Sequence, residues 1–299
     1  MKRSLLAALA VLFVTGCSGA GGSTLAPGTI SIVTTTTVFA DFVSNIGGSH
    51  VTVTSLVPKG GDVHTFDPSP SDAVVMTGAK LVVMNGLGLD DWLMPFVQNT
   101  GNADIPILKL GEGLAGVDYI AAGEGEAGSD NPHLWMDVQY ARKYADAIRA
   151  KLDEIDPANK SDYDANAANY DARLVELDQY VRSQIATIPE ANRKMVTFHD
   201  AFPYYARDYG ITIVGVAVPA PGQDPSAGQI ADLVNAIKAS GVKLVLAEVQ
   251  FPDNLVREIA SDTGARLESD LYDDALTDQI TSYDAEIRWD TDRIVEGLR

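Results

Sequence analysis

Cysteine is almost absent from this chain, since Cys17 is the only one among 299 residues. No disulfide can therefore form within the chain, and no cluster of thiolates can hold a metal. Basic residues are also scarce: 22 Lys and Arg stand against 41 Asp and Glu, which gives a formal charge of −19. Such an acidic chain is a poor partner for nucleic acid, so we expect none. No apolar run approaches the roughly twenty residues that a membrane-spanning helix needs.

The amino terminus carries a short targeting signal. Two basic residues precede an apolar run at 5–14, which is about half the length needed to cross a bilayer. Val14-Thr15-Gly16-Cys17 follows and resembles the bacterial lipobox, in which the cysteine becomes the lipid-modified first residue. We therefore expect residues 1–16 to be a signal peptide and residues 17–29, rich in Gly, Ser and Ala, to be a flexible lipidated tether.

One long amphipathic stretch divides the rest of the chain. Its apolar residues recur at intervals of three and four, at Tyr163, Ala167, Tyr170, Leu174, Leu177, Val181, Ile185 and Ile188. This spacing predicts a helix, which we place at 156–189 between Asp156-Pro157 and Pro189. A helix of that length would span roughly 45 Å. It is expected to join an N-terminal lobe (30–155) to a C-terminal lobe (190–299).

Both predicted lobes alternate short β-branched runs with amphipathic segments. This alternation is typical of parallel sheets covered by helices. The predicted fold class is therefore α/β, with two parallel-sheet lobes joined by one long rigid helix. Residues 111–131 are rich in glycine and acidic residues and show neither the helical nor the strand pattern of apolar residues, so we expect a mobile loop there.

Three of the four histidines lie in polar loops that follow a predicted strand or precede a predicted helix. His64 and His133 come before the long helix, and His199 comes after it. Loops at the carboxyl ends of parallel strands meet in one crevice, where ligands bind. The intervals between these histidines fit no zinc-finger or HExxH motif, so a site made from them has to be assembled by the fold.

Four stretches of the chain resemble one known family, the zinc/manganese solute-binding lipoproteins of bacterial ABC metal importers. They match its four ligand loops in order and are Val57 to Pro70, Asn131 to Asp137, Thr197 to Gly210 and Leu271 to Leu276. The similarity covers essentially the whole chain from about Ile30. Carried over position by position, it implies His64, His133, His199 and Asp274 as metal ligands in the cleft between the lobes. It leaves Asp270 and Asp273 open as substitutes for Asp274.

The resemblance also implies a cargo and a partner. Three imidazoles and one carboxylate suit Zn²⁺ as a tetrahedron, and suit Mn²⁺ if the carboxylate binds through both oxygens. In this family a histidine at the third ligand position favours zinc and a glutamate favours manganese. His199 therefore favours zinc, although the loop at 111–131 lacks the histidines that many zinc members carry there. The chain is expected to be a monomeric extracytoplasmic receptor that is anchored through Cys17 and delivers its metal to an ABC permease.

Two other functions compete with this one. A zinc hydrolase could use the three histidines with water in the fourth position, and Asp200 or Glu248 would then act as the base. The same fold could instead bind a siderophore or haem, although the acidic composition argues against that cargo. Among the remaining residues, we expect His50 to be exposed, and Phe66 and Trp135 to form walls of the cleft.

Overall fold

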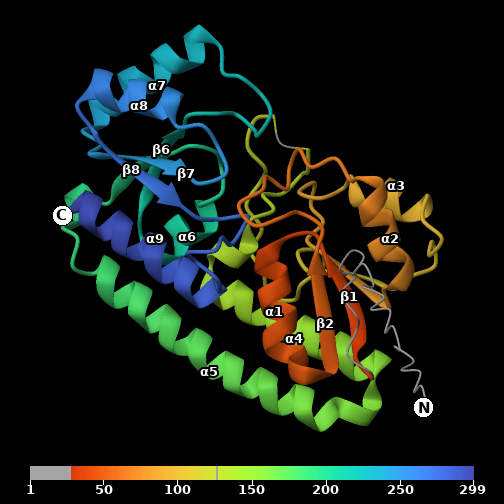
Figure 1. Ribbon diagram of the computed structural model, residues 1–299. Coiled ribbons are helices and arrows are strands. Elements are labelled where there is room, and N and C mark those ends of the chain that lie inside the picture. Colours follow the sequence, from red (N-terminus) through yellow and green to blue (C-terminus); the bar gives the residue numbers. More distant parts are fainter. Residues whose placement is uncertain (1–27, 126) are drawn as a thin grey trace, which may run out of the picture.

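The computed structural model describes residues 28–125 and 127–299, so the predicted signal peptide and Cys17 lie outside the described residues. Within them lie eight strands: β1 (Ile30–Thr34), β2 (Val51–Ser55), β3 (Leu81–Met84), β4 (Ile107–Lys109), β5 (Lys194–Thr197), β6 (Thr212–Val216), β7 (Leu244–Glu248) and β8 (Arg266–Leu271). They form two parallel sheets, with strand orders β2-β1-β3-β4 and β6-β5-β7-β8. The predicted pair of parallel-sheet α/β lobes is confirmed (Figure 1).

Helices flank both sheets and connect their strands. They are α1 (Thr37–Gly47), α2 (Pro70–Gly78), α3 (Leu93–Gln98), α4 (Val138–Ile155), α5 (Lys160–Ile185), α6 (Pro203–Tyr209), α7 (Ala227–Ser240), α8 (Asn254–Thr263) and α9 (Tyr283–Leu298). Several begin at polar caps, as α4 does at Asp137, whose side chain accepts a hydrogen bond from the Gln139 amide at 2.8 Å.

The long helix α5 runs along one side of the molecule, past both lobes (Figure 1). Its 26 residues span about 39 Å. It begins later than predicted because Asp156 leaves the helical conformation and ends α4, and Pro157 starts a separate 3-10 turn over Pro157–Asn159. The Asp156 carboxylate instead accepts a hydrogen bond from the Tyr163 hydroxyl, at 2.6 Å. His50 is half-buried at this end of the helix and pairs with Asp162 at 2.8 Å, so the expectation of an exposed His50 is wrong.

The apolar face of α5 belongs to a core that both lobes share. Leu174 and Leu177 are fully buried in a cluster that contains Phe42 from the N-terminal lobe and Tyr283 from the C-terminal lobe. The rings of Phe42 and Tyr283 lie 4.8 Å apart, and the Tyr283 hydroxyl donates to the carbonyl of Trp135 at 2.5 Å. The two lobes are therefore packed against one another as well as joined by the helix.

The segment predicted as a mobile loop lies against the C-terminal lobe. The Ile120 amide donates to the Tyr204 hydroxyl at 3.1 Å, and that hydroxyl donates to the carbonyl of Asn131 at 3.0 Å. The Asn131 side chain donates to the carbonyl of Asp200 at 2.7 Å. These bonds hold described parts of the segment in place and tie it to the loop that carries His199.

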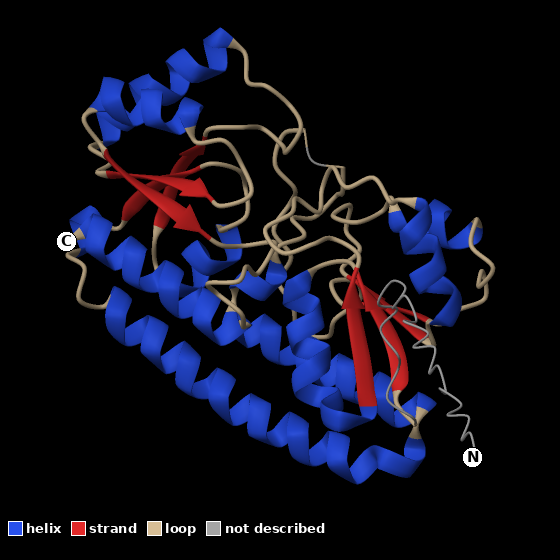
Figure 2. Ribbon diagram, viewed as in Figure 1, coloured by secondary structure: helices blue, strands red, loops and turns tan. Residues whose placement is uncertain are grey.

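The two sheets point their carboxyl ends at a common region. Figure 2 shows the strand arrows of both sheets ending at the same group of central loops. Because β2, β5 and β8 all end there, the loops that follow them converge between the lobes. This convergence brings the predicted ligand loops together.

Candidate metal centre

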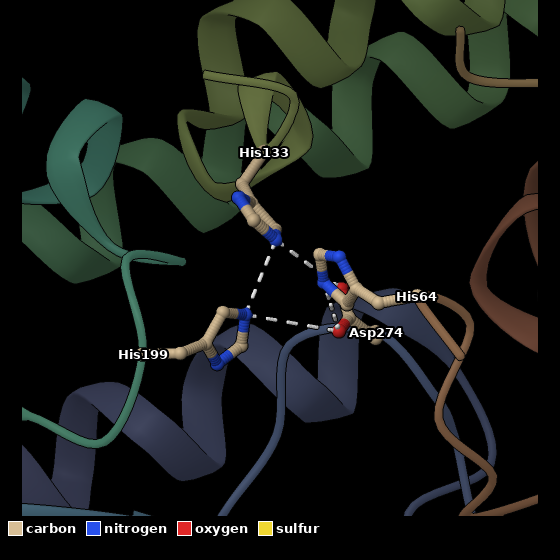
Figure 3. A group of neighbouring side chains, drawn as sticks. All are labelled: His64, His133, His199 and Asp274. Atoms are coloured by element: carbon tan, nitrogen blue, oxygen red, sulfur yellow. Dashed lines mark hydrogen bonds and ion pairs between the residues drawn. The ribbon is translucent and has the colours of Figure 1, made fainter. Parts of the chain in front are cut away.

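Four loops from distant parts of the chain supply the central side chains (Figure 3). His64 lies in the loop between β2 and α2, and His133 immediately precedes a 3-10 turn at Leu134–Met136. His199 lies just past the end of β5, and Asp274 just past the end of β8. The structure thus brings together all four residues that the sequence predicted, two from each side of α5.

The polar atoms of these side chains have the spacing of ligands around one ion. His133 Nε2 and His199 Nε2 are 3.3 Å apart, and His64 Nε2 lies 3.2 Å from Asp274 Oδ2. Asp274 Oδ1 is 3.6 Å from His133 Nε2, and Asp274 Oδ2 is 3.9 Å from His199 Nε2. In a tetrahedral zinc site with bonds of about 2.0–2.1 Å, the ligand atoms are roughly 3.3 Å apart. The arrangement can therefore hold a divalent cation.

The site is almost entirely closed to solvent, and two of its polar atoms lack hydrogen-bond partners. The side chains of His133, His199 and Asp274 have no exposed surface, and that of His64 is 8% exposed. His64 Nε2 and Asp274 Oδ1 are buried atoms without a hydrogen-bond partner. Buried polar atoms without partners are costly, and a cation at the centre would satisfy both.

Burial and charge act in opposite directions on these groups. Burial lowers the pKa of His64, but the neighbouring Asp274 carboxylate outweighs it and raises that pKa above the ordinary 6.5. Burial alone dominates at His133 and lowers its pKa well below 6.5. Burial would raise the pKa of Asp274, but the imidazoles, His64 first among them, hold it well below its ordinary value. Asp274 is therefore an anion facing three imidazoles.

A second set of acids lies behind His199. Glu248 Oε2 is 2.5 Å from His199 Nδ1, and Asp273 Oδ2 is 3.5 Å from the same nitrogen. Burial raises the pKa of Glu248 and of Asp273 well above the ordinary values, and neighbouring carboxylates raise both further. These acids contact the imidazole nitrogen that faces away from Asp274. The sequence placed Glu248 at the end of a buried strand, but no local signal connected it to His199.

Asp270, near the end of β8, and Asp273 and Asp274, in the fourth loop, take different positions. The carboxylate of Asp274 faces the three imidazoles. Asp273 accepts from the Asp274 amide at 2.7 Å and contacts Gln250, whereas Asp270 is exposed. Asp274 is thus the aspartate whose carboxylate completes the four-residue group. Because its carboxylate faces the three imidazoles, the geometry does not show the open fourth side that a hydrolase would use for water.

The surrounding residues include one that the sequence did not single out. Asn131 Oδ1 accepts from the His133 amide at 3.0 Å and lies 3.2 Å from His133 Nδ1. Trp135 is buried and packs its ring 5.3 Å from that of His133, as expected for a wall of the site. Phe66 instead packs against Trp92, with ring centroids 5.1 Å apart.

Comparison with known protein families gives two matches. Residues 32–297 match the family model of zinc-uptake complex component A, periplasmic. Residues 1–18 match the model of the prokaryotic membrane lipoprotein lipid attachment site. Among the described helices, none has the length and apolar character needed to cross a membrane.

Individual relatives bind several metals. The chain is 32% identical to the manganese-binding lipoprotein MntA of Halalkalibacterium halodurans, over 89% of this chain and 86% of the relative. It is 30% identical to the iron-binding protein YfeA of Yersinia pestis, with the same coverage. It is 28% identical to the metal ABC transporter substrate-binding lipoprotein FimA of Streptococcus parasanguinis, over 97% of this chain and 96% of that one.

Solved structures show the same fold. The Mn-bound periplasmic metal-binding protein of Candidatus Liberibacter asiaticus matches with a TM-score of 0.81 and 25% identity, over 91% of this chain and all of that one. The FpvC protein of Pseudomonas aeruginosa in complex with Mn²⁺ matches with a TM-score of 0.80 and 28% identity, over 90% and 98% of the two chains.

Proposed function

Because this chain belongs to the periplasmic zinc-uptake complex component A family, we propose that its four-residue centre captures Zn²⁺ for delivery to an ABC permease. The chain is a lipid-anchored, extracytoplasmic substrate-binding protein for metal and not an enzyme. The observation that supports the site is that His64, His133, His199 and Asp274 each place one potential ligand atom within 4.8 Å of those of the other three. That spacing suits a single bare ion and leaves no room for a molecule as large as a haem or a siderophore.

Zinc is the proposed cargo because three imidazoles and a carboxylate make a four-ligand set of borderline softness. Zinc also binds such a set more tightly than manganese does on the Irving-Williams order. Manganese is the alternative, since Asp274 turns Oδ2 toward His64 and Oδ1 toward His133 and could bind through both oxygens. Metal analysis of protein purified without added metal, followed by competition between zinc and manganese, tests the choice.

The ligand assignment is tested by substitution. Asp274→Ala should weaken zinc binding by more than about 100-fold, because it removes the only anion among the four proposed ligands. This loss should exceed the 10- to 100-fold loss that is typical when a residue contacting a ligand, and not the metal, is removed. His50→Ala is the matched control, because His50 pairs with Asp162 away from the centre. Affinities measured by competition with a chromogenic chelator should separate the two variants. Equal affinities for both variants would contradict the assignment.

The anchor and the organisation of the chain belong to the same proposal. Cys17 is proposed as the lipid-bearing residue, because it is the only cysteine in the sequence and lies within the matched attachment segment, one residue before its end. All four proposed ligands come from one chain, so we propose that a monomer suffices. The proposed organisation is lobes at 30–155 and 190–299 joined through 156–189. Mass spectrometry of the membrane-extracted protein tests the lipid, and light scattering tests the monomer.

A further inference from the structure

The two fully buried imidazoles face each other through their Nε2 atoms, which are 3.3 Å apart. A neutral imidazole carries its proton on one nitrogen and a lone pair on the other. Which nitrogen is bare depends on the partner of the other nitrogen. The Nδ1 partners of His133 and His199 therefore decide whether both Nε2 atoms can bind metal.

Asn131 is the partner on the N-terminal side. Its Oδ1 accepts from the His133 amide at 3.0 Å and faces His133 Nδ1 at 3.2 Å. Its Nδ2 donates to the carbonyl of Asp200 at 2.7 Å. The carbonyl of Asp200 can only accept, so the amide cannot turn around without losing both contacts. An oxygen is thereby fixed opposite His133 Nδ1, and this requires the proton on that nitrogen.

Glu248 is the partner on the C-terminal side. Its side chain is fully buried at the carboxyl end of β7. Its Oε2 lies 2.5 Å from His199 Nδ1, and its Oε1 accepts from the His199 amide at 3.4 Å. One carboxylate thus receives both the backbone and the ring N–H of the same histidine. An ionised carboxylate can only accept, so in that state Glu248 keeps the proton on His199 Nδ1 and leaves Nε2 bare.

We propose that Asn131 and Glu248 are positioning residues that lock His133 and His199 in the tautomer with a bare Nε2. The proposal rests on the proposed function, in which these imidazoles bind the cation. Two lone pairs that face each other at 3.3 Å repel, and a cation between them removes the repulsion. Asn131 and Glu248 thus leave both Nε2 lone pairs available to a cation. They also prevent a hydrogen bond from one imidazole Nε2 to the other, which would occupy a lone pair that the metal needs.

Substitution of Glu248 tests the lock. Glu248→Ala is expected to weaken zinc binding 10- to 100-fold, the range found when an outer partner of a metal-bound histidine is removed. Glu248→Gln should recover much of the affinity, because its oxygen can still accept from His199 Nδ1. Asn131→Ala should weaken binding as Glu248→Ala does. Glu286→Gln is the matched control, since Glu286 is an equally buried glutamate outside the four-residue group.

Nitrogen-15 NMR of the four histidines separates a tautomer lock from a merely structural role. In the zinc-free wild type, long-range correlations should place the protons of His133 and His199 on Nδ1. The His199 Nδ1 proton should shift upfield in Glu248→Gln, and in Glu248→Ala the Nδ1 tautomer should lose population. His50 provides the internal reference. Wild-type tautomers in Glu248→Ala, or an affinity within twofold of wild type, would overturn the proposal.

The failure of this proposal can be told apart from failure of the proposed function. If Asp274→Ala leaves zinc binding intact, the site itself is wrong. If Asp274→Ala abolishes binding while Glu248→Ala and Asn131→Ala bind normally, only the tautomer lock is wrong. Thermal unfolding of each variant identifies any that have lost the fold. If Glu248→Ala is one of them, the upfield shift of the His199 Nδ1 proton in the nearly isosteric Glu248→Gln carries the test.

Discussion

His64 differs from His133 in its response to pH. It is the one with some exposed surface, and its pKa is raised because the interaction with Asp274 outweighs burial. His133 has no exposed surface, and burial lowers its pKa well below 6.5. In the metal-free protein, a proton therefore competes with a cation near neutral pH at His64 more than at His133.

Metal affinity should accordingly fall as the pH is lowered. Because the folded-state pKa of His64 lies above 6.5, protonation begins above that pH, and below it zinc must displace about one proton. Zinc titrations from pH 8 to pH 5 should show the apparent affinity dropping about tenfold per pH unit in the acid part of this range. His50→Ala should leave the profile unchanged. Undiminished binding at pH 5 would show that the imidazoles do not bind the ion.

The residues of the site were unequally predictable. His64, His133, His199 and Asp274 follow strands or precede a turn, and each lies in a motif that can be read locally. Asn131 and Glu248 act through contacts with partners elsewhere in the chain: Asn131 with Asp200 across the lobes, and Glu248 with His199 in the loop that follows the neighbouring strand β5. Their roles depend on tertiary packing, which spacing along the sequence does not encode.

At the scale of elements, α5 acts as part of the core and not as a free connector. Its buried residues lie in the same cluster as side chains from α1, α4 and α9. Leu177 on this face has no exposed surface, whereas the neighbouring Glu176 is exposed. The stability of both lobes should therefore depend on the buried face of one helix.

Leu177→Ala should lower the free energy of unfolding by about 2–5 kcal/mol, the usual cost of a cavity left by a buried leucine. Glu176→Ala, one residue earlier and on the exposed face, should change it by less than about 0.5 kcal/mol. Urea unfolding followed by tryptophan fluorescence and by circular dichroism measures both. Because the lobes share their core, the two signals should move together in Leu177→Ala. Separate transitions for the two probes would argue against a shared core.

Periodicity predicted the elements well where it existed. The stripe from Tyr163 to Ile188 predicted the long helix, but α5 is shorter at both ends: Pro157 opens a separate turn before it, and it stops at Ile185, before Ile188. Residues 111–131 have no periodicity and read as a mobile loop, yet Ile120 and Asn131 are bonded to Tyr204. Hydrogen bonds to a partner more than seventy positions away leave no local pattern in the sequence.

The molecule as a whole contains buried carboxyl groups whose surroundings disfavour the charged form, in addition to its net negative charge. Burial is the largest influence on each: it raises the pKa of Asp41 and of Asp90 to about 6, and that of Asp137 to about 7. The ordinary value, which the unfolded chain retains, is 3.8. Between these values the folded chain holds more protons than the unfolded chain, so the free energy of unfolding falls as the pH rises.

The metal-free protein should therefore be more stable at pH 5.5 than at pH 7.5. Over this range each such carboxyl contributes about 1–2 kcal/mol, present at low pH and lost as the pH rises through its folded-state pKa. Thermal unfolding in the presence of a chelator measures this trend. Asp41→Asn, which keeps an oxygen to accept from the Tyr283 amide, should reduce the slope. A melting temperature that climbs toward pH 7.5 would contradict the assignment.

Three of the four side chains at the centre have no surface that solvent can reach. An external chelator therefore has no direct route to a bound ion, and the ion leaves only when the protein opens. The release rate should then reach a plateau that no amount of chelator increases. On the proposed function, we expect the permease to open the loops where a chelator in solution cannot, so that delivery depends on docking.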